Sequence, residues 1–236
     1  LVYLNVAGIE SENSENVEIY NNVAHDNTGG ILVFDLPGLT RYGRDIKVYD
    51  NNVFNNNLFN FAPAGNIVGT VPPGTGVMVL ATQEVEIYSN KIHNNDMIGV
   101  AIVSYDLIDA MKGKDPDKEK KKKSSAQRFE NKRKKDPEYN SFPRSIYVHG
   151  NNYESSAMLP DMGNDFGKLL FWKFGFNRPE IVWDGILSDD YHLADGSVNP
   201  LYKICVQEDE VKTAVLDAAN NFDGLESNPQ VLECAL

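Results

Sequence analysis

The densest group of side chains that could do chemistry lies near the C-terminal end, in the stretch WDGILSDDYHLADG. Enzymes that cleave polysaccharides need two carboxyl groups, one acting as a general acid and the other as a base or nucleophile. The simplest interpretation of the stretch is a solvated acidic loop, and the functional alternatives are calcium binding and catalysis. The candidate catalytic residues are Asp189, Asp190 and His192, which lie between Asp184 and Asp195.

A second group consists of the five aromatic residues in FGKLLFWKFGF, which spans residues 166–176. Aromatic rings at this density either pack against the body of the protein or present flat faces for stacking on sugars. Packing is the simpler interpretation. If the stretch binds a ligand, we expect Trp172 and Phe174 to make the contact.

Positive charge is concentrated in one segment of an acidic chain. The chain of 236 residues carries 22 Lys and Arg against 34 Asp and Glu, a net charge of −12. Residues 112–138 hold 12 of the basic and 6 of the acidic residues, so the remainder carries 10 against 28, or −18. This balance argues against nucleic-acid binding, which requires neutralised phosphates. The segment is either a solvated arm or a contact for an acidic protein, a polyanionic polysaccharide or anionic lipid, with Lys121, Lys122 and Arg133 as candidates.

Four stretches that align without gaps indicate which elements position these side chains. They are VEIYNNVAHDN, IKVYDNNVFNN, VEIYSNKIHNN and IYVHGNNYESS, beginning at Val17, Ile46, Val85 and Ile146. Each opens with β-branched residues two places apart, which is typical of a strand with one buried face. Asn fills the sixth position every time, and Asn or Ser the eleventh. The sixth-position residues are Asn22, Asn51, Asn90 and Asn151, and the eleventh-position residues are Asn27, Asn56, Asn95 and Ser156.

The uneven spacing of these stretches indicates a solenoid with inserted loops. Their starts are 29, 39 and 61 residues apart, and a second strand follows a glycine in GILVFDL, GVMVLAT and GVAIVSY. Stacked coils would pair each strand in parallel with its equivalent at about 4.8 Å. Asn side chains that lie above one another could then form a hydrogen-bonded ladder. Ordinary turn preference is the alternative explanation of the Asn columns.

The predicted fold is all-β, with the solenoid over residues 1–204, a basic insertion at 106–144 and a capping segment over 205–236. A cap is expected because the last coil would otherwise expose unpaired backbone groups. The stretch EDEVKTAVLDAANNF has the pattern of a short amphipathic helix, which we expect to cover the open end.

Two histidines occupy equivalent positions in two repeats. His25 and His93 stand eight places into their repeats, and Phe54 fills that position in the repeat between them. Two rungs would separate the imidazoles by roughly 9 to 10 Å, too far for both to bind one zinc ion. We therefore expect outward-facing side chains beside a bend, and no metal site.

The only two cysteines, Cys205 and Cys234, lie in the last 32 residues. They are too few for a disulfide scaffold and lack the spacing of metal ligands. A disulfide that closes the C-terminal segment is the favoured interpretation, and two free thiols are the alternative. A disulfide would indicate an exported protein.

The pattern V-x-[IV]-[YH]-x-N over residues 1 to about 186 resembles the right-handed parallel β-helix proteins, a superfamily that includes pectate lyases, polygalacturonases and alginate epimerases. The resemblance implies a right-handed, single-stranded parallel β-helix. The segments NPLYKICVQ, FDGLESNP and ECAL are similar to an uncharacterised branch of bacterial exported β-helix proteins. Members of that branch carry lipoprotein or ordinary signal peptides and are often encoded beside a c-type cytochrome.

The sequence favours an exported, non-enzymatic protein that presents a rigid surface to a polysaccharide or to another envelope protein, with a c-type cytochrome as one candidate partner. The alternative is a polysaccharide lyase, hydrolase or epimerase acting on acidic polysaccharide. The catalytic motifs of those enzymes and the C-x-x-C-H haem motif do not occur here. No cofactor other than calcium is indicated. We expect residues to precede the opening LVYLNVAG, which has no signal-peptide features, and no run is long enough for a transmembrane helix.

Overall fold

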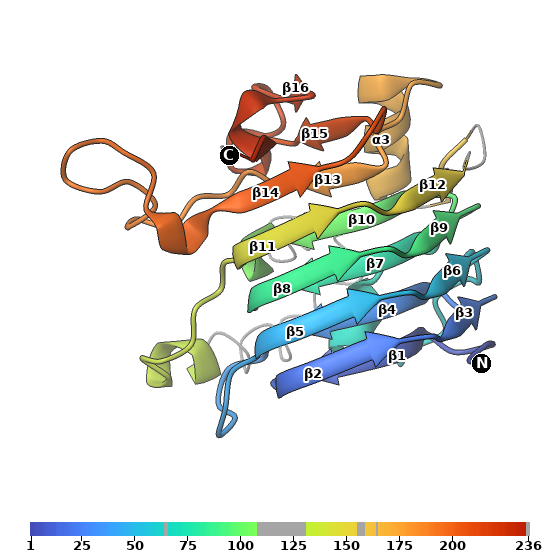
Figure 1. Cartoon of the computed structure of the whole chain (residues 1–236), viewed down its shortest axis with the longest axis horizontal. Helices are drawn as coiled ribbons and strands as arrows, with labels where there is room; N and C mark the ends of the chain where they lie inside the picture. The colour runs from blue at the N-terminus through green and yellow to red at the C-terminus, as the bar shows by residue number, and fades with distance from the viewer. Residues whose placement is uncertain (64–65, 108–130, 155–158, 164, 235–236) are drawn as a thin grey trace.

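The chain is a right-handed parallel β-helix in which three sheets run along one solenoid (Figure 1). The computed structural model describes residues 1–63, 66–107, 131–154, 159–163 and 165–234. Equivalent strands of successive coils pair in parallel, and the only antiparallel pair among the named strands of the described residues joins β15 and β16. The predicted fold class is confirmed.

Each sheet collects equivalent strands from successive coils, and β16 joins the end of one sheet antiparallel. The five-stranded sheet contains β2 (Glu15–Tyr20), β5 (Arg44–Tyr49), β8 (Gln83–Tyr88), β11 (Arg144–His149) and β14 (Ile204–Gln207). The four-stranded sheet contains β3 (Val23–His25), β6 (Asn52–Phe54), β9 (Lys91–His93) and β12 (Asn152–Glu154). The seven-stranded sheet contains β1 (Ala7–Glu12), β4 (Gly29–Phe34), β7 (Thr75–Leu80), β10 (Ile98–Val103), β13 (Ile181–Trp183), β15 (Thr213–Val215) and β16 (Glu226–Ser227).

Short helices occupy the excursions between strands. Those that lie wholly within the described residues are η1 (Ile67–Thr70), α3 (Asp165–Phe174), η2 (Pro200–Tyr202), η3 (Ala218–Asn220) and η4 (Gln230–Leu232). No helix in the described part of the chain is both long and apolar enough to cross a membrane.

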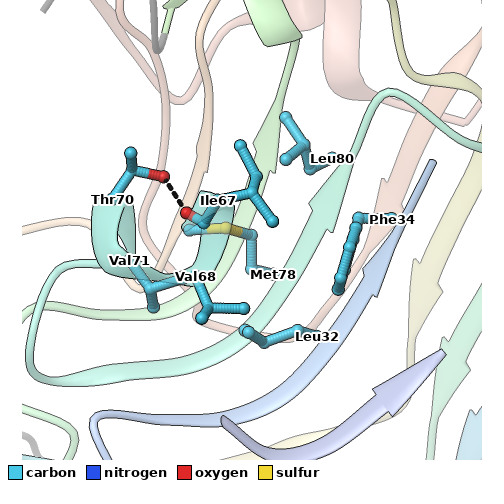
Figure 2. A pocket seen from close by; sticks show the side chains of 8 residues that line it. All are labelled: Leu32, Phe34, Ile67, Val68, Thr70, Val71, Met78 and Leu80. Carbon is cyan, nitrogen blue, oxygen red and sulfur yellow. Dashed lines mark hydrogen bonds between the residues drawn. The ribbon is translucent and has the colours of Figure 1, made fainter. Parts of the chain in front are cut away.

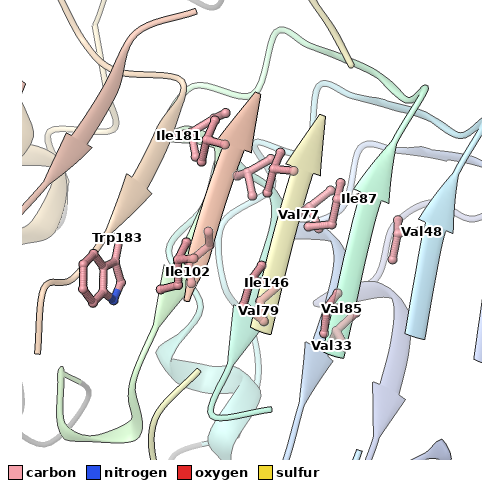
Figure 3. Close-up of a cluster of buried hydrophobic side chains, with 14 of the residues drawn as sticks. Val33, Val48, Val77, Val79, Val85, Ile87, Ile102, Ile146, Ile181 and Trp183 are labelled. Carbon is pink, nitrogen blue, oxygen red and sulfur yellow. The ribbon is translucent and has the colours of Figure 1, made fainter. Parts of the chain in front are cut away.

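Valine and isoleucine columns fill the interior of the solenoid (Figure 3). Strand pairing places Ile46 beside Val85 and Val85 beside Ile146, so equivalent positions of three coils form one column. All three side chains are buried. A single coil could not remove these side chains from water, so stacking supplies the burial that stabilises every coil.

The corner between the five-stranded and four-stranded sheets repeats one backbone conformation. Asn21, Asp50, Ser89 and Gly150 all have φ between 52° and 59°. This left-handed region is reached most readily by Gly and, among other residues, by Asn and Asp. The corner residues of the sequence therefore turn the chain at the same angle in each coil, which keeps the strands in register.

Asn side chains directly after this corner form a hydrogen-bonded ladder. The Nδ2 of Asn22 donates to Oδ1 of Asn51 at 3.1 Å, Asn51 donates to Asn90 at 2.9 Å, and Asn90 donates to Asn151 at 2.9 Å. The carboxylate of Glu208 accepts from Asn151 and ends the ladder. Each buried amide thus has the partners that its removal from water requires.

A second ladder follows the four-stranded sheet. Asn27 donates to Asn56 at 3.0 Å and Asn56 donates to Asn95 at 3.1 Å. Ser156, the equivalent residue of the fourth repeat, lies outside the described residues. Two ladders therefore stiffen two consecutive corners of the solenoid.

The α-helix expected to begin at Glu208 is wrong. The segment instead contains the strand β15, the single turn η3 and a loop, and β15 pairs with β13. The free edge of β13 supplies backbone partners, and Ala214 and Leu216 are fully buried at alternating positions. Tertiary pairing therefore overrides the helical pattern. The 205–236 capping segment stays a prediction; β14 and β15 within it pair directly with solenoid strands.

Candidate functional site

The acidic stretch after β13 is divided between the interior and the surface. Asp184 is fully buried, and its carboxylate accepts hydrogen bonds from the backbone N (2.6 Å) and Oγ (2.7 Å) of Ser104 and from the backbone N of Ile186 (3.1 Å). Burial raises the pKa of Asp184 to about 6, although these hydrogen bonds act in the opposite direction. Its oxygens join two neighbouring coils.

The candidate catalytic residues lie in the exposed loop that follows. Asp189, Asp190 and His192 are all exposed. Asp190 accepts hydrogen bonds from Ser188 and, at 2.7 Å, from the Tyr202 hydroxyl, and these bonds lower its pKa. The loop therefore holds Asp190 as a carboxylate bound to its own neighbours, and a catalytic role for the three residues stays a prediction.

Metal binding by this loop likewise stays a prediction. Asp195 accepts from the backbone N and the hydroxyl of Ser197, which lowers its pKa. Within the described ranges, no three His, Cys, Asp or Glu side chains gather closely enough to hold a metal ion. The calcium alternative gains no geometric support from the described side chains.

The basic segment is represented in the described residues only by its C-terminal end. Lys121 and Lys122 lie outside the described residues. Arg133 forms an ion pair with Asp106, and both side chains are about one-third exposed. The Arg133 guanidinium is therefore paired with a carboxylate at the start of the insertion. A role for Arg133 in partner binding stays a prediction.

The aromatic stretch forms the helix α3, on which the two candidate binding residues, Trp172 and Phe174, differ in their exposure to solvent. Phe166 and Leu170 are buried, and Phe174 packs against the same apolar cluster. Trp172, in contrast, is 87% exposed, and Phe176 beyond the helix is 68% exposed. The helix therefore both covers the solenoid and presents an indole ring to solvent.

His25 and His93 belong to a column of stacked rings. The ring centroids of His25 and Phe54 are 5.1 Å apart, and those of Phe54 and His93 are 4.9 Å apart. Tyr3 extends the column beyond His25 at 5.6 Å. Because Phe54 lies between the imidazoles, they share no ligand, and desolvation followed by repulsion from Lys91 lowers the pKa of His93.

A second ring column runs along the outer face of the five-stranded sheet. It contains Tyr20, Tyr49, Tyr88 and His149, with ring centroids 4.9–5.3 Å apart and interplanar angles of 4–6°. The [YH] position of the repeat pattern is the signal for this column. Neighbouring rings cover each other's faces, so the inner rings offer a ligand only their edges.

The outer face of the seven-stranded sheet carries an apolar groove that the sequence analysis missed. The groove lies between η1 and α3 and is lined by Thr70, Pro72, Thr75, Met78, Ile98, Ala101, Val103, Leu107 and Phe166. A second apolar pocket adjoins it, and Figure 2 shows Ile67, Val68 and Val71 packing toward Met78, Leu80 and Leu32 there. The available signal was the run of apolar residues in GILVFDL, GVMVLAT and GVAIVSY, which is typical of strands buried on both faces.

A disulfide fixes the C-terminal segment to the five-stranded sheet. Cys205 on β14 is bonded to Cys234, with 5.0 Å between their Cα atoms. Val206 and Glu233 form an isolated parallel bridge beside it. The predicted disulfide is confirmed.

A family model described as "Right handed beta helix region" matches residues 2–108. The match covers the first three repeats and supports the β-helix fold. Neither the search of curated proteins nor the search of solved structures found a match.

Proposed function

We propose that this chain is an exported binding protein that takes an apolar side chain of another envelope protein into the groove between η1 and α3. The observation that carries the proposal is the lining of the groove, where seven apolar side chains and two threonines stand along neighbouring coils. Binding sites of this kind bury apolar surface of a partner and use few polar groups for orientation.

The arrangement around the groove suits a protein partner. The helix α3 contributes Phe166 to the lining and exposes Trp172 on another side. Tryptophan is one of the residue types enriched among those that dominate binding energy at protein interfaces. A partner that enters the groove and continues over α3 would bury both surfaces.

The two Asn ladders give this surface its stiffness. Because buried amides tie each coil to the next, the strands under the groove hold their spacing before a partner arrives. A preorganised surface loses little conformational entropy on binding. The disulfide supports export, because such bonds persist in oxidising compartments.

A polysaccharide is the alternative partner, and a c-type cytochrome is one candidate among envelope proteins. The cytochrome rests on the family resemblance alone. Polysaccharide binding would favour exposed aromatic faces with free polar groups, and Trp172 is the described residue with the most accessible ring.

Substitution of one groove residue tests the proposal. Met78 is partly exposed in the groove, so Met78→Lys places a charge there while its chain can still reach water. Met162, 41% exposed and outside the groove lining, gives the matched control Met162→Lys. Immobilised wild-type chain and Met162→Lys should retain the same protein from an envelope extract, and Met78→Lys should lose at least tenfold of the binding.

Enzymatic assays test the alternative function, a carbohydrate-active enzyme. The wild-type chain should release no shortened or unsaturated products from alginate or pectate. Product formation by the wild type, reduced by Asp190→Asn, would replace the binding function with a carbohydrate-active one. Equal retention of the partner by the wild type, Met162→Lys and Met78→Lys would show that the groove is not the binding site.

A further inference from the structure

A loop on the excursion between β6 and β7 combines exposed aromatic rings with a complete lack of charge. In residues 51–83 there is no Asp, Glu, Lys, Arg or His, although 24% of the chain is charged. Within this run, residues 57–63 form a segment that we name the phenylalanine loop. Phe59 is 69% exposed and Phe61 is 49% exposed, and their ring centroids are 5.9 Å apart in an edge-to-face arrangement.

The side-chain amides of this loop hold it in one conformation. Asn60 donates to the carbonyl oxygens of Val68 (2.8 Å) and Val71 (2.9 Å) and accepts from the backbone N of Ala62 at 3.0 Å. Asn57 donates to the carbonyl oxygen of Asn94 and accepts from the backbone N of Asp96. Since both amides are engaged on the donor and the acceptor side, the rings on either side of Asn60 are presented on a rigid base.

The backbone of the loop is also anchored to the preceding coil. The backbone N of Leu58 donates to the carbonyl oxygen of Asn27 at 3.0 Å, and the Thr28 hydroxyl donates to the carbonyl oxygen of Phe59 at 3.3 Å. Large rings that are held in water by a well-bonded loop lose the free energy that burial would supply. Rings exposed in this way mark a contact surface.

The chemistry of the loop identifies what it contacts. Sugars need free hydrogen-bonding groups beside the aromatic rings, and the Asn57 and Asn60 amides are already used inside the protein. A chain with a net charge of −12 is repelled by anionic lipid. An exposed apolar surface without charge or free side-chain amides matches the interfacial region of an uncharged bilayer, where affinity follows the apolar area inserted.

We infer that the phenylalanine loop docks this protein on an electrically neutral lipid bilayer by inserting the rings of Phe59 and Phe61. None of residues 57–63 lines the groove of the proposed function. Two rings give reversible attachment rather than permanent anchoring. Removal of each ring should lower the partition coefficient roughly tenfold.

Flotation with phosphatidylcholine vesicles tests the inference. The wild-type chain should float with the vesicles, and Phe59→Ser/Phe61→Ser should lose roughly a hundredfold of the partitioning. The matched control is Trp172→Ser/Phe176→Ser, which removes two exposed aromatic rings elsewhere and should float like the wild type. Thermal unfolding should agree between the variants, because all four side chains lie on the surface.

A fluorescent ring gives a second measurement that does not depend on loss of binding. Phe59→Trp in a Trp172→Phe background should show a blue-shifted emission on adding the vesicles and quenching by lipids brominated in their acyl chains. The Trp172→Phe parent, which keeps the buried Trp183, corrects for background. Absence of flotation by the wild type, or flotation that survives loss of both phenylalanines, would overturn the inference. Binding only to anionic vesicles would also overturn it. The same holds if Phe59→Ser/Phe61→Ser loses a protein partner while the wild type binds no vesicles.

Discussion

The outer faces of the five-stranded and seven-stranded sheets differ although the same coils build both. On the five-stranded sheet, side chains such as Lys47, Glu86 and Tyr49 point outward and are partly exposed. On the seven-stranded sheet, the outward positions include Leu32 and Leu80, which are buried in a second apolar cluster. In Figure 1 the five-stranded sheet lies in front of the seven-stranded one.

The difference shows how one repeat gives its two sheets outer faces of different polarity. The five-stranded sheet relies on the shared interior and on the Asn ladder at its corner, and its outward side chains stay partly exposed. The seven-stranded sheet has apolar residues on both faces, so it needs the covering excursions η1 and α3. Where that cover leaves a gap, the groove appears.

The largest effect is expected from breaking the ladder that supports the five-stranded sheet. Asn90 donates to Asn151 Oδ1 and to the carbonyl oxygens of Val48 and Tyr88, and accepts from Asn51. Asn90→Ala would leave several buried groups without partners, at a cost of about 1–3 kcal/mol for each buried group left unsatisfied. We expect the free energy of unfolding to fall by about 4 kcal/mol in urea denaturation.

The position of Asn22 at the end of the ladder provides the control. Asn22 is partly exposed and water can replace its partners, so Asn22→Ala should cost about 1 kcal/mol. Equal losses for the two variants would show that the ladder stabilises no more than an ordinary turn.

The next largest effect is expected at outward-facing residues, whose substitution should cost more stability on the seven-stranded sheet than on the five-stranded sheet. Leu32→Ala on the seven-stranded sheet removes a buried side chain and should cost about 3 kcal/mol. Lys47→Ala on the five-stranded sheet should change stability by less than about 0.5 kcal/mol. Chemical denaturation measures both, and a similar cost for both substitutions would erase the distinction between the two faces.

The pH dependence of stability should arise mainly from the seven-stranded side. Asp35 follows β4 and Asp184 follows β13, and burial raises the pKa of each to about 6. In the unfolded chain both pKa values are near 4, so between pH 4 and 6 the folded state binds more protons. These groups therefore add stability below about pH 4, and that contribution is lost as the pH rises through 6.

Asp184→Asn should remove the part of the pH dependence of stability that arises from Asp184. The wild type should lose roughly 1–3 kcal/mol from this group between pH 4 and 7, and the variant should lose less because its amide does not ionise. Thermal or urea unfolding at several pH values measures the difference. An identical pH profile for wild type and variant would contradict the assignment to Asp184.

The smallest effect is expected from the ring column on the five-stranded sheet. Tyr49 stacks between Tyr20 and Tyr88 at 5.0 and 4.9 Å. Tyr49→Ala should lower the free energy of unfolding by about 1 kcal/mol, because stacked pairs contribute about that much at a partly exposed site. Tyr49→Phe keeps the stacking and should behave like the wild type. A loss as large as that of Leu32→Ala would show that this partly exposed face contributes as much to stability as the buried outer face of the seven-stranded sheet.

The repeat made the interior predictable. The period-two patterns that begin at Ile46, Val85 and Ile146 are local signals that recur, and so is the Asn five places after each start. They specified the coil, the parallel stacking and the corner. The pattern failed at residues 208–222, where an apparently helical spacing becomes the strand β15. The free edge of β13, which no local signal reveals, decided that outcome.

The candidate sites were less predictable than the fold. Asp184 and Asp190 are six residues apart, but one is bound inside the solenoid and the other faces solvent. Trp172 and Phe174 are neighbours in the aromatic stretch and point to different surroundings. Residue type shows that a group is capable of chemistry, whereas burial and partners decide whether that group is available.

The sequence by itself determined the coil, its Asn-bearing corners, the acidic surface and the two cysteines, because each follows from residue type or from contacts repeated at short range. Only the tertiary structure decided which apolar faces are covered, where a groove remains and which carboxylates enter the core. Those features depend on excursions of unequal length that fold back over the sheets, and such contacts join residues far apart in the chain without any repeating signal.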